Sequence, residues 1–174
     1  MVRAMKNPLN RVACLGLALG GIFGMAGTMV AAANLRAAFW ALDAVGLVVA
    51  ASILALSYFR KDKLAVASGF LVFAIGEAVM LSGTASSLDA SVPAFAAGTA
   101  LWSAALLLTC VPKEFAVWTR LTGVVAAILF AIVATQIFLG APLTPLSRPL
   151  PFFGYPFLVL TFAGWIWTTL KERA

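Results

Sequence analysis

The chain has 174 residues and a formal net charge of +6; 63% of its residues are hydrophobic and only 10% are charged. Soluble domains are about 45–50% apolar and about 25% charged, so this composition excludes a soluble enzyme, a disordered tail and a nucleic-acid-binding domain. The chain has no histidine and two cysteines. We therefore expect no metal, no cofactor and no nucleic-acid partner.

Six apolar runs follow one another along the chain, each long enough to cross a bilayer, which takes about 20 residues. The expected membrane spans are residues 12–33, 37–59, 64–83, 92–111, 116–139 and 152–170. They leave no room for a soluble domain. The sequence therefore predicts an all-α membrane protein, a six-transmembrane-helix bundle that forms a single integral membrane domain over residues 1–174.

The first run also resembles a signal peptide, because basic residues precede it and Ala31-Ala32-Ala33 has the small side chains of a cleavage site. Its apolar part is longer than the core of a signal peptide, which is about 7–15 residues. We expect it to remain in the mature protein as a membrane span.

Basic residues divide unequally between the two sides of the membrane that six spans create. Cytoplasmic loops of membrane proteins carry an excess of Lys and Arg. With the N-terminus in the cytoplasm, only Arg36 and Arg148 fall outside. The cytoplasmic side then holds Arg3, Lys6, Arg11, Arg60, Lys61, Lys63, Lys113, Arg120, Lys171 and Arg173. We therefore expect an inner (plasma) membrane protein with both termini in the cytoplasm.

Three glycines recur every four residues in the first span and give its helix one flat face: Gly16, Gly20 and Gly24. Membrane helices associate through such faces, because lipid offers no hydrophobic drive. One interpretation is packing within the bundle; the other is docking of a second copy or of a membrane partner subunit. The third span has a similar seam, with glycines spaced by seven residues at Gly69, Gly76 and Gly83.

Short matches between the two halves hint at a weak 3+3 inverted repeat, as in several transporter folds. Residues 46–51 (GLVVAA) resemble residues 123–127 (GVVAA), and residues 70–72 (FLV) resemble residues 157–159 (FLV). Such matches also arise by chance in a chain rich in Ala, Val and Leu. The repeat is therefore a hypothesis.

Two carboxylates lie inside apolar runs, Asp43 in the second span and Glu77 in the third. Asp43 is 17 residues before Arg60, at the turn between these spans, and Glu77 is 17 residues after it. At about 1.5 Å per residue, both acids lie roughly 25 Å from the turn. We expect them to meet at one depth in the outer part of the membrane, facing the bundle interior and sharing a proton or binding a cation.

Further polar residues near the outer side extend this candidate ligand- or proton-binding site. Arg36 and Trp40 lie on the same helical face as Asp43, because they precede it by seven and three residues. The others are Gln136, Arg148 and Tyr155. The alternative is structural: the two acids and the two outer arginines neutralise each other and fix the helices in place.

No catalytic motif accompanies the acids, so we expect no enzyme. The first functional hypothesis is a small polytopic membrane carrier or permease component with an outward-facing polar site around Asp43 and Glu77, proton- or cation-coupled. A chain of this length is short for a complete carrier, so a homo-oligomer or a membrane partner subunit is expected in the lipid bilayer. The alternative hypothesis is a non-catalytic accessory or assembly subunit of a larger membrane protein complex.

Overall fold

The computed structural model describes residues 8–84, 88–142 and 150–171. Their helices are α1 (Pro8–Met29), α2 (Ala33–Phe59), α3 (Leu64–Thr84), α4 (Leu88–Cys110), α5 (Val117–Phe138) and α6 (Leu150–Lys171). Each of these helices is long and apolar enough to cross a membrane. The prediction of an all-helical chain with six helices able to span a membrane is therefore confirmed.

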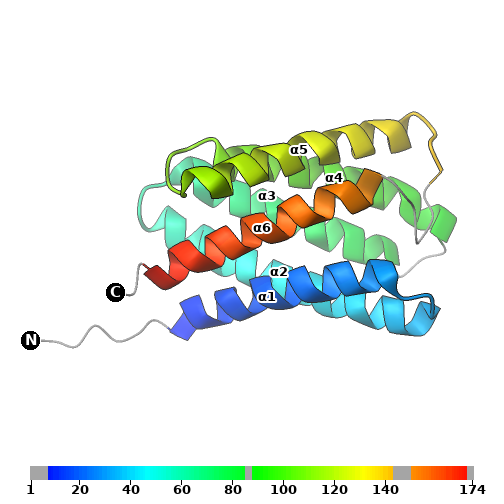
Figure 1. The fold of residues 1–174 in the computed structure, drawn as a ribbon, viewed down its shortest axis with the longest axis horizontal. Helices are drawn as coiled ribbons and strands as arrows, with labels where there is room; N and C mark the ends of the chain where they lie inside the picture. The colour runs from blue at the N-terminus through cyan, green and yellow to red at the C-terminus, as the bar shows by residue number, and fades with distance from the viewer. Residues whose placement is uncertain (1–7, 85–87, 143–149, 172–174) are drawn as a thin grey trace, which may run out of the picture.

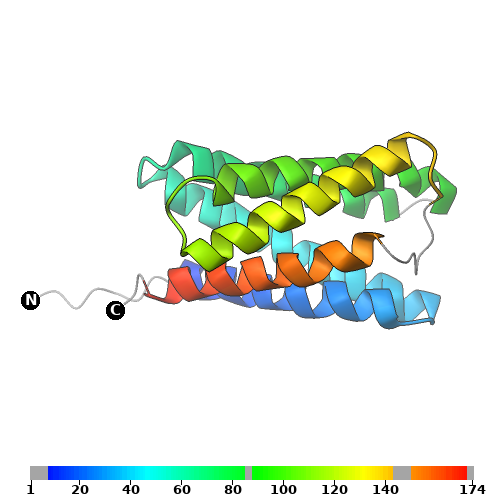
Figure 2. The same ribbon diagram turned by 45° about the horizontal axis from the view of Figure 1, so that its top comes forward.

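The six helices form a closed ring in which neighbours along the chain run antiparallel (Figures 1 and 2). Each helix packs on the next in sequence, and α1 also packs on α6, which closes the ring. Over the described residues, no other helix pair brings its backbones together. Both chain ends and the α2–α3 and α4–α5 connections lie at one end of the ring, the terminal end (Figure 1). The opposite end is called the far end.

The first helix differs from its predicted span, because α1 begins at Pro8 and ends at Met29, whereas hydropathy predicted residues 12–33. Proline is well tolerated at the first helical position, where its missing N–H would have no partner. At the other end, the chain turns before Ala33 starts α2. The apolar run therefore includes a turn, which hydropathy does not detect.

The flat glycine face of α1 lies against α2. Side chains at Gly16 would collide with the Gly46 carbonyl oxygen, and side chains at Gly20 would collide with Leu47. Gly24 faces the Asp43 carboxylate. The interpretation of this face as a docking surface for another chain is wrong, because α2 covers it within the same chain.

The three glycines of α3 lie on one seam against α4. Gly69 faces Ala105 and Thr109, Gly76 faces Gly98, and Gly83 faces Ala94. Glycine lets the two backbones approach where any side chain would hold them apart. The α1–α2 and α3–α4 pairs are therefore each held together along a small-residue seam.

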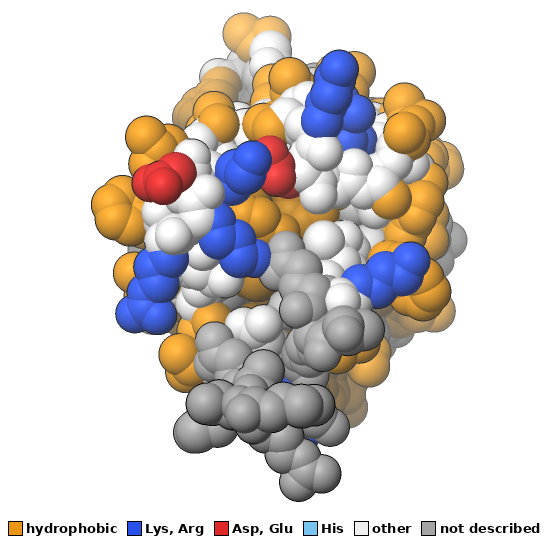
Figure 3. Space-filling view, turned by 90° about the vertical axis from the view of Figure 1, so that its left-hand side faces the viewer, with side chains coloured by type: hydrophobic (Ala, Val, Ile, Leu, Met, Phe, Trp, Pro, Cys, Tyr) orange, Lys and Arg blue, Asp and Glu red, His pale blue; other side chains and the backbone are white. Residues whose placement is uncertain are grey.

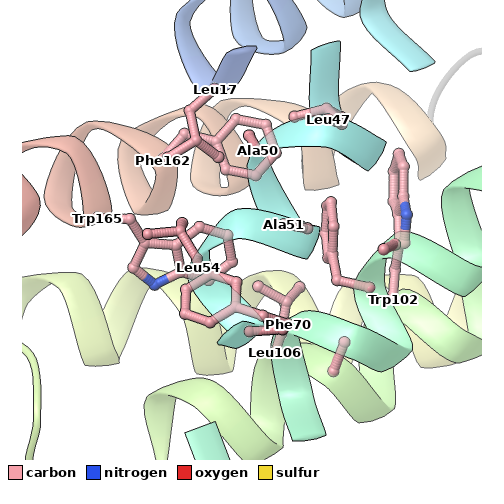
Figure 4. Packing of buried hydrophobic residues seen from close by; sticks show 14 of the residues in the cluster. Leu17, Leu47, Ala50, Ala51, Leu54, Phe70, Trp102, Leu106, Phe162 and Trp165 are labelled. Carbon is pink, nitrogen blue, oxygen red and sulfur yellow. The ribbon is translucent and has the colours of Figure 1, made fainter. Parts of the chain in front are cut away.

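Aromatic rings fill much of the interior of the ring of helices. Side chains from α1, α2, α3, α4 and α6 point toward one another there (Figure 4). The Trp165 ring lies 4.7 Å from that of Phe70 and 6.0 Å from that of Phe73. At the terminal end, Phe115 from the α4–α5 connection is buried against Tyr58. The interior toward the terminal end is therefore packed with rings.

Two arginines bind the end of the helix that precedes their own. The Arg36 guanidinium donates to the carbonyl oxygens of Val30 and Ala31 at 3.1 and 3.3 Å. Arg120 donates in the same way to the last residue of α4 and the residue after it, Cys110 and Val111, at 3.0 and 2.9 Å. Cations satisfy the free carbonyls at a helix C-terminus.

The 3+3 inverted repeat that the sequence suggested remains a hypothesis.

Replacing Gly16 with alanine should destabilise the protein. The new Cβ would meet a backbone oxygen of α2, which cannot move aside as a side chain can, so we expect a loss of about 1–3 kcal/mol. Gly21→Ala is the matched control, because its Cβ would meet Val159 and Phe162 at ordinary distances of 3.6 and 3.7 Å, and alanine favours a helix over glycine. Thermal unfolding in detergent measures both. Equal stability of the two variants would contradict the packing described for the α1–α2 seam.

Candidate functional site

Asp43 on α2 and Glu77 on α3 both point into the ring of helices. Their exposed fractions are 8% and 3%, and their carboxylates lie close enough to interact electrostatically. The α2–α3 hairpin brings them together, because both acids lie equally far along the chain from its turn. Both acids are thus buried inside the ring of helices, as expected. Their role in binding a ligand or proton remains a prediction.

Residues of α1, α4 and α6 lie around these carboxylates, and Phe130 of α5 packs on two of them, Trp102 and Tyr155. A Cβ at Gly24 would lie 3.0 Å from Asp43 Oδ2. Trp102 Nε1 lies beside the Glu77 carboxylate. Tyr155, which is partly buried, lies near enough to both acids to interact with their charges. We call this set the acid site: Gly24, Asp43, Glu77, Trp102, Phe130 and Tyr155.

The wall of the acid site opposite the carboxylates is aromatic. The Trp102 ring lies 5.3 Å from that of Phe130 and 6.3 Å from that of Tyr155. The Phe130 and Tyr155 rings are 6.0 Å apart. A further ring, Phe73, stacks on Trp102 at 5.3 Å, on the side toward the terminal end. Two of these rings, Trp102 and Tyr155, therefore lie beside the acids, and Phe130 packs on both of them.

Three polar atoms of the acid site are buried without a hydrogen-bond partner among the described residues: Asp43 Oδ1, Glu77 Oε2 and Trp102 Nε1. Buried polar atoms in proteins are nearly always paired. Two more such atoms, on Thr119 and Trp165, belong to positions nearer the terminal end. The acid site is therefore where unpaired polar groups from three different helices gather.

Two polar side chains elsewhere in the bundle do find partners across helix boundaries. The Ser103 hydroxyl of α4 donates to the Ala127 carbonyl oxygen of α5 at 2.8 Å. The Thr161 hydroxyl of α6 donates to the Thr122 hydroxyl of α5 at 3.1 Å. Such bonds tie membrane helices together. The unpaired acids are therefore a local feature of the α2–α3 interface and its surroundings.

Arg36 and Trp40 do not neutralise the acid pair. The Arg36 guanidinium binds the end of α1 and lies over the Trp40 ring, 5.7 Å from its centroid. Trp40 in turn packs on Gly27 of α1. The helical face that they share with Asp43 was predicted correctly, but the guanidinium reaches carbonyl oxygens because these are free at the helix end. The structural alternative, in which Arg36 pairs with an acid, is wrong, and the predicted role of Arg36 in a binding site stays a prediction.

Of the two other predicted members of the polar cluster, the structure describes only Gln136. Gln136 is exposed, because α5 turns Val133, Ala134 and Ile137 inward. Its predicted place in the cluster is wrong. Arg148 lies outside the described residues.

Trp102 and Phe130 were not predicted to belong to the site. An indole in the middle of a span, far from either interface, was a usable signal for Trp102, since its N–H needs a partner in an apolar interior. Phe130 had no such signal, because phenylalanine is common in every span. Comparisons with protein-family models, curated proteins and solved structures gave no match.

Proposed function

We propose that this chain is a small multi-pass membrane carrier or permease component. Its polar site, around Asp43 and Glu77, exchanges a proton or another cation. The observation that supports this most directly is the gathering of three unpartnered buried polar atoms from α2, α3 and α4. An ionised carboxylate inside a membrane costs roughly 2–3 kcal/mol even on lenient scales. An exchangeable cation would offset that cost.

The alternative that the acids only brace the helices is less well supported. Leaving one member of a buried ion pair without its partner destabilises a protein by about 3–5 kcal/mol, so a brace is expected to contain both charges. Among the described residues, the observed ion pair joins Lys63 to Glu114 at 2.9 Å, away from the acid site. Among the described residues, no cation pairs with the acids as a brace needs.

The charge of the site gives a simple means of coupling. Two ionised carboxylates carry a charge of −2, one shared proton reduces it to −1, and a second proton or a monovalent cation makes the site neutral. A neutral site is less costly to enclose in an apolar bundle than a charged one. The helices would therefore close over the loaded site more readily than over the empty one, as a proton- or cation-coupled carrier requires.

The proposed access route runs from the far end. Between the acid site and the terminal end, the interior holds Phe73, Phe70 and Trp165, and below them Tyr58 and Phe115. We propose that this packing closes the terminal side and leaves the acid site to be reached from outside.

We also propose that the chain lies in the inner (plasma) membrane with both termini in the cytoplasm. The helices place the described Lys and Arg residues, apart from Arg36, at the terminal end: Arg11, Arg60, Lys61, Lys63, Lys113, Arg120 and Lys171. Lys and Arg side chains surround this end (Figure 3). Such an excess is typical of the cytoplasmic side.

The lipid bilayer is the proposed surrounding of the bundle, with a second copy or a membrane partner subunit completing the carrier. The face of Gly16, Gly20 and Gly24 does not provide that contact, since α2 covers it. The alternative proposal is a non-catalytic accessory or assembly subunit, and it too would need a docking surface other than this face.

The orientation can be tested with reporter fusions after Lys171. A fused green fluorescent protein, which fluoresces in the cytoplasm, should be bright, and a fused alkaline phosphatase, which needs an oxidising compartment, should be inactive. Fusions within the α1–α2 connection should give the opposite pattern, because that connection lies at the far end. An active phosphatase after Lys171 would show that the positive end faces outward.

The carrier function can be tested by recording charge movement from reconstituted vesicles on a solid-supported membrane. Steps in pH, Na⁺ or K⁺ concentration should give a transient current with the natural chain, because a cation entering the acid site displaces charge across the bilayer. Asp43→Asn and Glu77→Gln should abolish the current. Glu114→Gln is the matched control, since it removes a carboxylate outside the acid site, and its current should persist.

The same recordings separate the two functional proposals. A natural chain that gives no current with any step, together with unfolding of both acid variants, would favour the accessory role with the acids as a brace.

A further inference from the structure

The unpaired atoms of the acid site define the hydrogen bonds that a ligand must make. Asp43 Oδ1 and Glu77 Oε2 are buried acceptors without a donor among the described residues. An organic ligand that satisfies both by hydrogen bonding carries at least two N–H or O–H donors, and a positive charge on it offsets the charge of the carboxylates. A primary ammonium group has three N–H donors on a single charged atom. A quaternary ammonium ion has the charge but no donor.

The chemistry of the surrounding wall points away from a multivalent metal ion. Ca²⁺ takes six to eight oxygen ligands and Mg²⁺ needs a nearly ideal octahedron. Among the described residues, no group of three or more His, Cys, Asp or Glu side chains gathers in one place. The remaining wall is aromatic, with Trp102, Phe130 and Tyr155 in mutual contact. Two carboxylates beside rings fit a small organic cation better.

Aromatic rings beside the acids suit the rest of such a ligand. A ring binds an organic cation through its negative face and covers the apolar carbon atoms attached to the ammonium. Trp102 is 3% exposed and Phe130 is 2% exposed, so both are fixed in the core. Tyr155 is only partly buried. It is therefore the ring of the wall that a ligand can displace.

The start of α6 allows Tyr155 to move. Pro156 lies inside this helix directly after Tyr155. Proline removes one backbone hydrogen bond from the helix interior and weakens the local turn. Gly154, on the other side of Tyr155, packs on the Phe130 ring. A small shift of this turn would open the aromatic wall beside the acids.

We propose that the acid site binds a primary ammonium ion attached to an apolar or aromatic body, with Asp43 and Glu77 receiving the ammonium and Tyr155 acting as the movable wall. This inference rests on the carrier function proposed above and specifies its substrate class. The ammonium donates to Asp43 Oδ1 and Glu77 Oε2, and the body lies between Tyr155 and the fixed rings.

Charge balance makes binding of the amine compete with a proton. Two carboxylates with two protons are neutral, and so are two carboxylates with one proton and one ammonium ion, so one proton leaves for each ammonium that binds. Tyr155 from α6 is the other titratable group near the acids. The residues that α1, α4 and α5 contribute to the acid site, Gly24, Trp102 and Phe130, do not titrate. The acid pair therefore supplies the released proton.

Calorimetric titration of the protein in lipid nanodiscs with phenethylammonium tests the proposal. Saturable binding is expected, with release of about one proton per ligand, measured by comparing buffers of different ionisation enthalpy. Asp43→Asn and Glu77→Gln should each weaken binding by about tenfold or more, because each removes a charge-assisted hydrogen bond. Phenethyl alcohol, which lacks the charge, should not bind. Phenethyltrimethylammonium, which lacks N–H donors, should bind less tightly.

Substitutions of Tyr155 test the contribution of the aromatic wall to binding. Tyr155→Leu should weaken binding by about threefold or more, whereas Tyr155→Phe should retain it. Trp167→Leu is the matched control, because this aromatic residue is 53% exposed and lies far from the acids, beside Lys171. Glu114→Gln is the control for the two acid variants, because it removes a carboxylate outside the acid site. Both controls should bind as the natural chain does.

Several results would overturn the proposal: no saturable binding of phenethylammonium, equal binding of phenethyl alcohol, or unchanged binding in both acid variants. They are distinguishable from failure of the carrier function. One possible result is that pH, Na⁺ or K⁺ steps evoke currents that depend on Asp43 and Glu77, while the amine does not bind. That result would support the carrier function and exclude the amine as its substrate. Absence of both the currents and amine binding would contradict both the carrier function and the amine as its substrate.

Discussion

Two carboxyl groups that lie together inside an apolar ring of helices constrain the rest of this structure. Asp43 and Glu77 come from neighbouring helices, and each has a buried oxygen without a partner among the described residues. The free energy of burying such groups must be recovered from a proton, a cation or tight packing around them. Trp102 and Tyr155 are the groups of the acid site able to donate hydrogen bonds to them. The acids and these two aromatic side chains therefore form one unit.

Glycine seams explain why this unit lies where it does. On one side Gly16 lets α1 approach α2, and on the other Gly76 lets α3 approach α4. These two pairs pack backbone against backbone and need no polar groups to hold them. The α2–α3 interface carries the two acids instead. Tight packing on both flanks thus keeps the carboxylates inside the ring and away from lipid.

Much of the fold could be predicted from the sequence, because hydropathy and residue spacing are local signals. Six apolar runs predicted the six helices. The equal number of residues from Arg60 to Asp43 and to Glu77 predicted that the two acids lie at one depth. Contacts across the ring could not be predicted in the same way. Gln136 was placed with the acids although its helix turns it outward, and Arg36, which one alternative paired with an acid, donates to carbonyl oxygens instead. Phe130 was missed because nothing in the sequence relates α5 to the α2–α3 hairpin.

The direct test of the account is a double-mutant cycle on unfolding free energy with Asp43→Asn, Glu77→Gln and the two combined. Distant, independent sites give additive effects within about 0.5 kcal/mol. Because the two carboxyl groups face each other without a neutralising partner among the described residues, the account predicts that the combined variant departs from additivity by more than that margin. It also predicts that neither single change unfolds the protein. Additive effects, or collapse of the fold in each single variant, would contradict a shared site.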